Sequence, residues 1–243
     1  MTETTPGTER AGIVSLGDEE AVKRVLTETL FGLWSTVNNL SRIKPSKRGR
    51  YRVTVFGSAR TDAQHWVYRE IKRMCVSLSA MGCDIITGGG PGLMQAANEG
   101  AAEAQATERV QNIGIRVELP FEQQVNPFVE QAFEHETFFT RLHQFVLMSD
   151  AYIVAPGGIG TVLEAMMIWQ LLQVRHLQDT PLIFVGEMWQ GLVDWAATSM
   201  LRPGFELASA PDMELPRCVS SADEAVAIIR QAQARWVADG TAS

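Results

Sequence analysis

The sequence predicts one α/β domain with a doubly wound parallel β-sheet and an extra helix at its N-terminus. Two observations support this fold class. Short apolar segments typical of buried strands alternate along the chain with segments whose apolar residues recur at helical spacing. Glycine-rich loops directly follow several of these strands, at the points where helices begin. A parallel sheet covered by helices on both faces accounts for both observations.

The first 48 residues are expected to lie outside the main domain. Residues 1–17 lack periodicity and predict a mobile tail. Apolar residues at three- and four-residue intervals then predict a helix over 19–43, which leads into the basic linker KPSKRGR. The helix and linker form an N-terminal region over 18–48, and the main domain is expected over 49–243.

Within the main domain, short β-branched or apolar runs closed by glycine or polar residues predict strands. These strands are expected at 52–56, 83–86, 110–118, 151–155 and 181–185. Helices are expected at 62–81, 92–105, 137–149, 160–175, 188–200 and 222–238, and a loop at 202–216. In such a sheet a ligand binds at the carboxyl ends of the strands, at a topological switch point.

The composition fits a globular domain that needs no disulfide bonds or bound metal ions for its stability. Of the 243 residues, 46% are hydrophobic and 20% are charged, which excludes wholesale disorder and fibrous architectures. The 21 Lys and Arg and 28 Asp and Glu give a net charge of −7, which argues against general nucleic-acid binding. The three cysteines lack CxxC spacing and the four histidines lack HExxH spacing, so we expect no metal and no cofactor.

Neither membrane insertion nor export is predicted. No stretch reaches the roughly 18 apolar residues that a membrane-spanning helix needs. The first residues, MTETTPGTER, lack the basic-then-apolar order of a secretory signal. With cysteines that suit reduced thiols, we expect a cytoplasmic protein.

Three loops that follow predicted strands carry the candidate ligand-binding residues. Glycine removes the Cβ that would keep a ligand off the backbone, so N–H groups at a helix N-terminus can face a phosphate. Two of the loops are glycine-rich and open a helix, which favours a phosphate-bearing ligand over tight turns alone. The candidates are Gly57, Ser58 and Arg60 in the first loop, Gly88, Gly89, Gly90, Gly92 and Met94 in the second, and Pro156, Gly157, Gly158, Gly160 and Thr161 in the third.

These loops differ from the common nucleotide motifs. A P-loop ends in Gly-Lys-Ser/Thr, and a dinucleotide site has GxGxxG after the first strand. Here the first strand runs into Gly57-Ser58-Ala59-Arg60. The sequence therefore predicts neither an ATPase nor an ordinary dehydrogenase.

Glu164 and Arg141 are the candidate catalytic residues, and each also has a structural explanation. Thr161 and Glu164 fit a Thr-x-x-Glu capping box, yet the carboxylate also follows a phosphate-type loop, where it is well placed to contact a ribose. Arg141 is expected in or just after the first turn of a helix beginning near Thr137, where the macrodipole disfavours a cation by about 0.3–1 kcal/mol. A nearby anion must therefore stabilise the Arg141 cation, and this anion can be either a structural carboxylate or a ligand phosphate.

Two motifs together resemble those of the Lonely Guy family of cytokinin-activating phosphoribohydrolases. They are TGGGPGLMQAANEGA at 87–101 and APGGIGTVLEAMM at 155–167. The resemblance implies a compact Rossmann-like nucleotide-binding domain that forms a homodimer or a larger homo-oligomer. It also implies hydrolysis of the N-glycosidic bond of AMP or its N6-prenylated forms to the free base and ribose 5-phosphate. The N-terminal helix is similar to the longer bacterial branch of the family.

The family motif PGGxGTxxE is matched from Pro156 to Glu164, and Arg141 matches the catalytic arginine, 164 − 141 = 23 residues upstream of Glu164. The resemblance implies that the glycine loops and Thr161 hold the 5′-phosphate. Glu164 is then expected to contact the ribose, and Arg141 to orient Glu164 or stabilise the departing base. Leu142 and Leu163 depart from the pattern, since they replace a lysine and the first of two glutamates.

Other functions remain open at this point. The family is often labelled lysine decarboxylase, but no lysine here lies in a recognisable cofactor-binding context. Molybdenum-cofactor carrier proteins look similar in sheet and loop, yet they store a phosphorylated pterin without turnover. A nucleotide sensor binds AMP without releasing product. The presence of both Arg141 and Glu164 favours the hydrolase.

Overall fold

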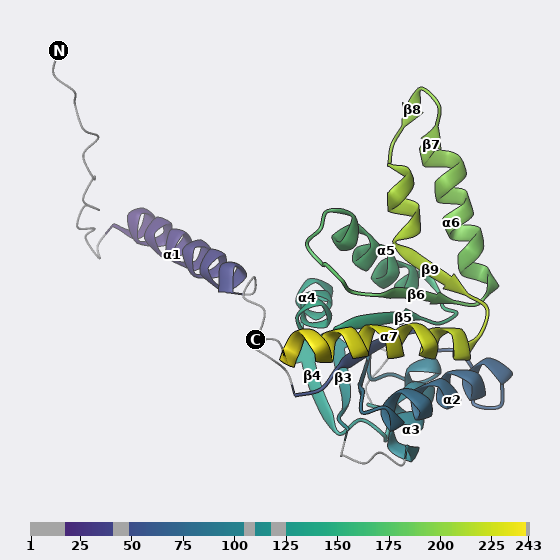
Figure 1. Cartoon of the computed structure of the whole chain (residues 1–243). Helices are drawn as coiled ribbons and strands as arrows, with labels where there is room; N and C mark the ends of the chain where they lie inside the picture. The colour runs from purple at the N-terminus through teal and green to yellow at the C-terminus, as the bar shows by residue number, and fades with distance from the viewer. Residues whose placement is uncertain (1–17, 41–48, 105–109, 118–124, 242–243) are drawn as a thin grey trace. The chain divides into compact units, whose positions relative to one another are not determined.

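The computed structural model describes residues 18–40, 49–104, 110–117 and 125–241, and the chain divides into two units, Met1–Ser46 and Lys47–Ser243 (Figure 1). In the first unit, α1 (Glu19–Leu40) begins where predicted. The Asp18 carboxylate accepts a hydrogen bond from the amide of Ala21 at 3.0 Å and caps the first turn. The predicted tail, the end of the predicted helix and most of the basic linker lie outside the described residues.

The second unit is built around a sheet that has seven strands within the described residues, and all neighbouring strands in it are parallel. The strand order is β4-β3-β2-β1-β5-β6-β9. The strands are β1 (Arg52–Phe56), β2 (Asp84–Thr87), β3 (Asn112–Val117), β4 (Gln131–His135), β5 (Ala151–Val154), β6 (Leu182–Val185) and β9 (Pro216–Val219). The chain builds outward from β1 to β4 and then returns to the other side of β1 with β5. This order confirms the predicted doubly wound sheet and places the switch point between β1 and β5.

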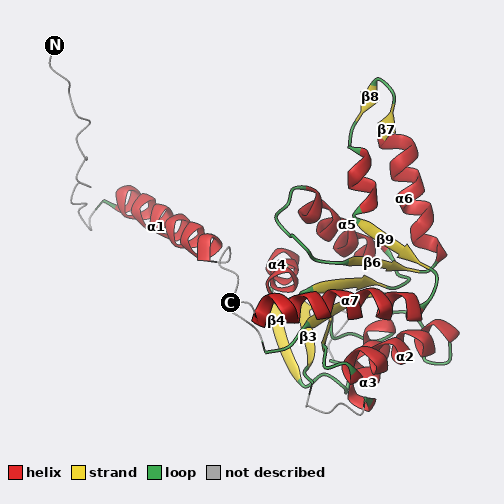
Figure 2. Cartoon of the chain, in the orientation of Figure 1, coloured by secondary structure: helices red, strands yellow, loops and turns green. Residues whose placement is uncertain are grey.

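Helices cover both faces of the sheet (Figure 2). One face carries α2 (Trp66–Ala80), α3 (Leu93–Glu103) and α7 (Ala222–Thr241), and the other carries α4 (Phe138–Met148), α5 (Ile159–Gln173) and α6 (Glu187–Met200). Side chains of β1 alternate between the two cores: Val53 and Val55 pack on the first face, and Phe56 packs on the second. None of the described helices is both long enough and apolar enough to span a bilayer.

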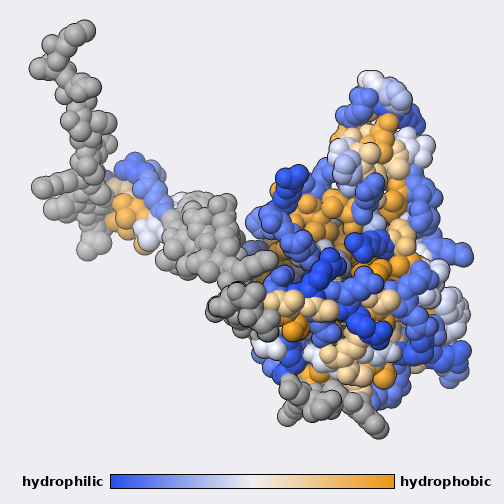
Figure 3. Space-filling model, in the orientation of Figure 1, coloured by the Kyte–Doolittle hydropathy of each residue, from blue (hydrophilic) through white to orange (hydrophobic). Residues whose placement is uncertain are grey.

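α6 leads into an arm formed with a short antiparallel hairpin, β7 (Leu201–Arg202) and β8 (Phe205–Glu206). The 3-10 helix η1 (Ala210–Glu214) follows, and the indole of Trp169 on α5 donates to the carbonyl of Asp212 at 2.7 Å. Apolar side chains are visible along this arm (Figure 3). The hydrogen bond from Trp169 anchors the base of the arm to the domain.

The two edge strands were not predicted. β4 has the sequence QAFEH with no buried residue, and β9 has the sequence PRCV. An edge strand pairs on one side only and tolerates polar residues facing solvent, so it lacks the apolar run that marks a buried strand. The loop predicted over 202–216 is also wrong, because this stretch contains β8, η1 and the start of β9.

Candidate active site

The three loops singled out in the sequence meet at the carboxyl edge of the sheet, around the switch point. The amide of Ser58, just after β1, donates to the carbonyl of Pro156 at 3.0 Å. The carbonyl of Ser58 accepts a hydrogen bond from the amide of Leu93 at 2.8 Å. A Cβ on Gly92 would lie 2.3 Å from the Ser58 carbonyl oxygen, and a Cβ on Gly57 would lie 2.9 Å from the Leu93 Cβ. Gly57 and Gly92 are therefore required for the loops to pack against one another.

The loop after β2 uses part of its own backbone to hold its shape. The amide of Gly89, at φ +73°, donates to the Thr87 hydroxyl at 2.9 Å. The carbonyl of Gly89 accepts from the amide of Asn126 at 2.9 Å, and that of Gly90 accepts from the Asn126 side chain at 3.0 Å. The amides of Gly89 and Leu93 therefore have acceptors within the protein, and a role for Gly89 in holding a phosphate stays a prediction.

A buried polar network below this loop was missed in the sequence. Oδ1 of Asn98, on α3, accepts from the Thr87 hydroxyl at 2.7 Å and from Nδ2 of Asn126 at 2.9 Å. Nδ2 of Asn98 donates to Asn112, whose own Nδ2 returns a hydrogen bond to the Asn98 carbonyl at 2.7 Å. All four side chains are buried. Because buried amides must be satisfied, this network fixes the path of the glycine loop.

Arg141 and Glu164 form a shielded ion pair at the centre of this edge. Nη1 of Arg141 lies 2.9 Å from Oε1 of Glu164, and the two side chains are 12% and 11% exposed. Nε of Arg141 donates to the carbonyl of Ile115 on β3 at 2.9 Å, and the guanidinium lies 5.1 Å from the centre of the Phe145 ring. A Cβ on Gly88 would lie 2.5 Å from Nη2. Arg141 thus connects β3, the second glycine loop and α5.

The position of Arg141 follows from the start of its helix. The helix α4 begins near Thr137 as predicted, and the Thr137 side chain caps it by accepting a hydrogen bond from the amide of Thr140. Arg141 therefore lies in the first turn, where the helix macrodipole repels a cation. Glu164 supplies the anion that this position requires.

The capping-box interpretation of Glu164 is wrong. α5 begins at Ile159 with Gly158 as its N-cap residue, so Glu164 lies more than one turn inside the helix and binds Arg141 instead. Burial raises the pKa of Glu164, while the charge of Arg141 and its hydrogen bond act in the opposite direction. A carboxyl group whose pKa is set by burial and by one cation is typical of a functional site.

The loop from Pro156 to Thr161 is better suited to bind an anion than the glycine loop after β2. Thr161 is buried, and a Cβ on Gly157 would lie 2.2 Å from its hydroxyl oxygen, so Gly157 makes room for this side chain. A Cβ on Gly158 or Gly160 would meet nothing within 4 Å. The amides of the first turn of α5 have no intrahelical acceptor and carry the positive end of the dipole. A phosphate can therefore approach this turn closely.

The remaining predicted residues lie around this centre. Met94 is beside the ion pair, since its sulfur would be 2.7 Å from a Cβ on Gly88. Arg60 lies on an exposed turn, where its amide donates to the Ser58 hydroxyl at 3.0 Å. The structure thus brings Gly88, Met94, Arg141 and Glu164 together and leaves the Arg60 side chain outside this group.

His135 was also missed as a site residue, although it lies at this edge. It is the last residue of β4 and pairs in register with Val117 of β3. Its Nε2 is buried and has no hydrogen-bond partner in the described part of the chain. Burial and the charge of Arg141 lower its pKa. The four histidines lack metal-binding spacing in the sequence, and the described ranges hold no cluster of three or more His, Cys, Asp or Glu side chains that could bind a metal ion.

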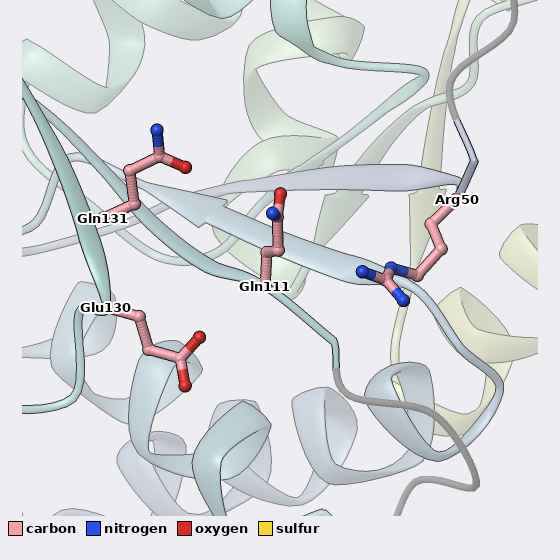
Figure 4. A pocket seen from close by; sticks show the side chains of 4 residues that line it. All are labelled: Arg50, Gln111, Glu130 and Gln131. Carbon is pink, nitrogen blue, oxygen red and sulfur yellow. The ribbon is translucent and has the colours of Figure 1, made fainter.

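A polar depression of about 460 Å³ lies at the opposite, amino edge of the sheet (Figure 4). Arg50, Gln111, Glu130 and Gln131 line it. These residues lie at or just before the starts of β1, β3 and β4. The depression is therefore separate from the edge that carries Arg141 and Glu164.

Comparison with known sequences identifies relatives. A family model described as "Possible lysine decarboxylase" matches residues 94–229. The chain is 30% identical over 145 residues to the pyrimidine/purine nucleotide 5′-monophosphate nucleosidase of Escherichia coli strain K12, across 55% of this chain and 30% of that protein. A protein of the same name from Escherichia coli O157:H7 matches equally. The match thus spans about 30% of the length of these curated relatives.

Solved structures share the fold. The molybdenum cofactor carrier protein of Chlamydomonas reinhardtii is 18% identical, with a TM-score of 0.56 over 76% of this chain and 99% of that one. The molybdenum cofactor binding protein of Rippkaea orientalis is 18% identical, with a TM-score of 0.57 over 76% of this chain and 98% of that one. At this identity the likeness concerns the fold alone.

Proposed function

Because this chain belongs to the Lonely Guy family, whose model is described as possible lysine decarboxylase, we propose that it hydrolyses the N-glycosidic bond of nucleoside 5′-monophosphates. The products are the free base and ribose 5-phosphate. The observation that carries this proposal is the shielded pair of Arg141 and Glu164, 2.9 Å apart beside two glycine loops. The name of the Escherichia coli nucleosidase supports a nucleotide monophosphate as the substrate class.

The substrate is placed by its phosphate. The first turn of α5, with Gly158 and Gly160 open to solvent, is the anion site and holds the 5′-phosphate. Glu164 lies on the same helix, after the first turn, and faces Arg141. A ribose attached to the phosphate therefore reaches Glu164, and binding of the phosphate supplies the orientation on which catalysis depends.

The reaction breaks the bond between C1′ and the base nitrogen. The electron pair of that bond leaves with the base, and positive charge develops on C1′ and the ring oxygen, as in glycoside hydrolysis. The ionised Glu164 stabilises this charge and accepts a proton from the water that adds to C1′. The departing base takes up a proton from solvent, and Glu164 returns its proton to solvent, so that the carboxylate is regenerated. Arg141 keeps the carboxylate of Glu164 ionised and oriented. Because the pair is shielded from water, the fixed charge of the carboxylate stabilises the transition state more strongly than it would in solvent.

We propose AMP and N6-modified AMP, the cytokinin nucleotides, as the substrates. Nothing in the chemistry at C1′ distinguishes one base from another, and the name of the relative includes pyrimidine nucleotides. A panel of AMP, N6-isopentenyl-AMP and CMP therefore measures the preference for the base. Equal rates for all three would contradict the assignment to adenine nucleotides.

The family description as a possible lysine decarboxylase finds no support in the candidate site. Lys72, on α2, binds Glu99 at 2.8 Å and Glu103 at 2.6 Å. α2 covers the face of the sheet opposite to α4 and α5. A lysine held in this surface network does not reach the Arg141 and Glu164 pair.

We also propose a homodimer or a larger homo-oligomer. Four apolar side chains at the starts of α4 and α5, close to the site, are exposed: Phe138 by 46%, Phe139 by 85%, Ile159 by 87% and Leu163 by 49%. Neighbouring exposed apolar side chains of this size are typical of interaction surfaces. Light scattering should give a multiple of the chain mass, and Phe139→Glu should lower it. A monomeric wild type would contradict the proposal.

A cytoplasmic location, with neither a membrane nor a nucleic acid as partner, completes the proposal. The net charge of −7 repels nucleic acid and anionic lipid. Cys75, Cys83 and Cys218 are free thiols in the structure. Fractionation of cells that express the tagged protein tests the location, and recovery in the membrane fraction would contradict it.

The experiment that tests the activity is product analysis. Purified protein is incubated with AMP, and chromatography separates adenine, adenosine and ribose 5-phosphate. Equal amounts of adenine and ribose 5-phosphate are expected. Tight binding of AMP without product would instead support a binding protein of the carrier or sensor type, and release of adenosine would indicate a phosphatase.

A further inference from the structure

His135 occupies a defined place at the edge of the sheet that carries the ion pair. β4 pairs with β3 so that Phe133 lies beside Ile115 and His135 beside Val117. Side chains two residues apart on a strand point to the same face. Ile115 belongs to the core under α4 and α5, and the partly buried Phe133 packs against it. The side chain of His135 therefore projects from the carboxyl edge on the face that carries Arg141 and Glu164.

The imidazole has a polar atom that no other described residue satisfies. Its Nε2 is buried and has no hydrogen-bond partner in the described ranges. A buried polar atom without a partner costs about 1–3 kcal/mol, which makes it rare in folded proteins. Burial and the charge of Arg141 lower the pKa of His135, which favours the neutral imidazole. A neutral ring with one open nitrogen suits an uncharged polar partner better than a phosphate.

The order of the groups across the sheet indicates which part of a nucleotide reaches this nitrogen. Glu164 comes from the helix that follows β5, whereas Arg141 binds the carbonyl of Ile115 in β3 and His135 ends β4. In the sheet, β3 lies three positions from β5, and β4 lies beyond β3 at the edge. With the phosphate on α5 and C1′ near Glu164, the base is the part that extends towards β4.

Building on the proposed function, we propose that Nε2 of His135 forms a hydrogen bond with the base of the bound nucleotide. Purine and pyrimidine rings carry several uncharged nitrogen and oxygen acceptors, and exocyclic amino groups that donate. A bond from Nε2–H to a ring acceptor also stabilises the electron pair that the departing base receives. His135 thus contributes to recognition of the base and to its departure.

The test separates the base from the sugar phosphate. Calorimetry is carried out in the Glu164→Gln background, which leaves AMP intact. It measures the affinities of AMP and of ribose 5-phosphate, which lacks the base, with His135 unchanged and with His135→Phe or His135→Gln. His176→Phe is the matched control, because His176 is exposed just beyond the C-terminal end of α5. We expect His135→Phe to weaken AMP binding about tenfold, the value of one hydrogen bond, and to leave ribose 5-phosphate within twofold. His135→Gln, which keeps a polar group, should recover part of the loss.

Three readouts decide the outcome. Unchanged AMP affinity and kcat/KM in His135→Phe would overturn the proposal, and so would equal weakening of ribose 5-phosphate. Thermal unfolding should show His135→Phe to be at least as stable as the wild type, because the substitution removes an unsatisfied buried nitrogen. A wild type that binds AMP but releases no base would overturn the proposed hydrolysis alone, since the two affinities still measure the contact with the base.

Discussion

Substitution of Gly88 by alanine displaces the arginine of the ion pair without touching either charged residue. The new Cβ would lie 2.5 Å from Nη2 of Arg141 and 2.7 Å from the sulfur of Met94. Ordinary contact begins at 3.4 Å, so the guanidinium must move by about 3.4 − 2.5 = 0.9 Å. The 2.9 Å bond to Glu164 and the 2.9 Å bond to the Ile115 carbonyl cannot both survive this shift.

The size of the effect follows from this displacement. A misplacement of about 1 Å in a catalytic group costs roughly 100-fold in rate, which corresponds to about 2.7 kcal/mol. The stability should change by no more than about 1 kcal/mol, because the contacted atoms are the ends of flexible side chains and alanine lowers the entropy of the unfolded chain. Gly88→Ala should therefore reduce kcat/KM for AMP about 100-fold in a folded protein.

The assay is the rate of adenine release together with thermal unfolding, and Gly191→Ala is the matched control. Gly191 lies within α6, and a Cβ there meets nothing within 4 Å. This control should keep full activity and gain about 0.5–1 kcal/mol of stability, as alanine does in a helix. Gly88→Ala with the kcat/KM of the wild type would refute the role assigned to the position of Arg141.

Three further predictions concern the pH response and the scaffold. Burial raises the pKa of Glu164, so the acid limb of kcat against pH should lie above the ordinary glutamate range. Because the pKa of Glu164 is higher in the native than in the unfolded protein, the free energy of unfolding should fall as pH rises from the unfolded to the native pKa. Glu164→Gln should abolish both this fall and the activity. Gly157→Ala should cost about 1–3 kcal/mol in urea unfolding because its Cβ overlaps Thr161, whereas Gly158→Ala should cost less; equal losses would contradict the packing argument. Asn98→Ala should lower the free energy of unfolding by about 1–3 kcal/mol for each buried group left unsatisfied, and an unchanged urea midpoint would show the network to be dispensable.

Much of the fold was predictable because the central strands bury both faces. β1, β2, β5 and β6 are short apolar runs, and their burial is what makes the pattern visible in the sequence. The edge strands β4 and β9 are partly exposed and carry polar residues, so their sequences do not differ from those of loops. They form strands because β4 pairs with β3 and β9 pairs with β6, which are tertiary contacts that the local sequence does not reveal.

The site was predictable where backbone geometry demands a particular residue. The glycines mark close approaches of the chain, and the anion required by Arg141 at its helix start is the carboxylate of Glu164. Asn98 and His135 were missed for a different reason. A lone Asn or His in a sequence is usually a surface residue. Asn98 and the Nε2 atom of His135 are buried, and this burial depends on strand order and loop paths.

The most direct test compares the wild type and Glu164→Gln in one time course with AMP, following adenine, ribose 5-phosphate and remaining AMP. The substitution keeps the size of the side chain and removes the negative charge opposite Arg141. We predict that the wild type converts AMP to equal amounts of both products, while Glu164→Gln still binds AMP and releases neither. Adenine release by the variant at the rate of the wild type would contradict the account.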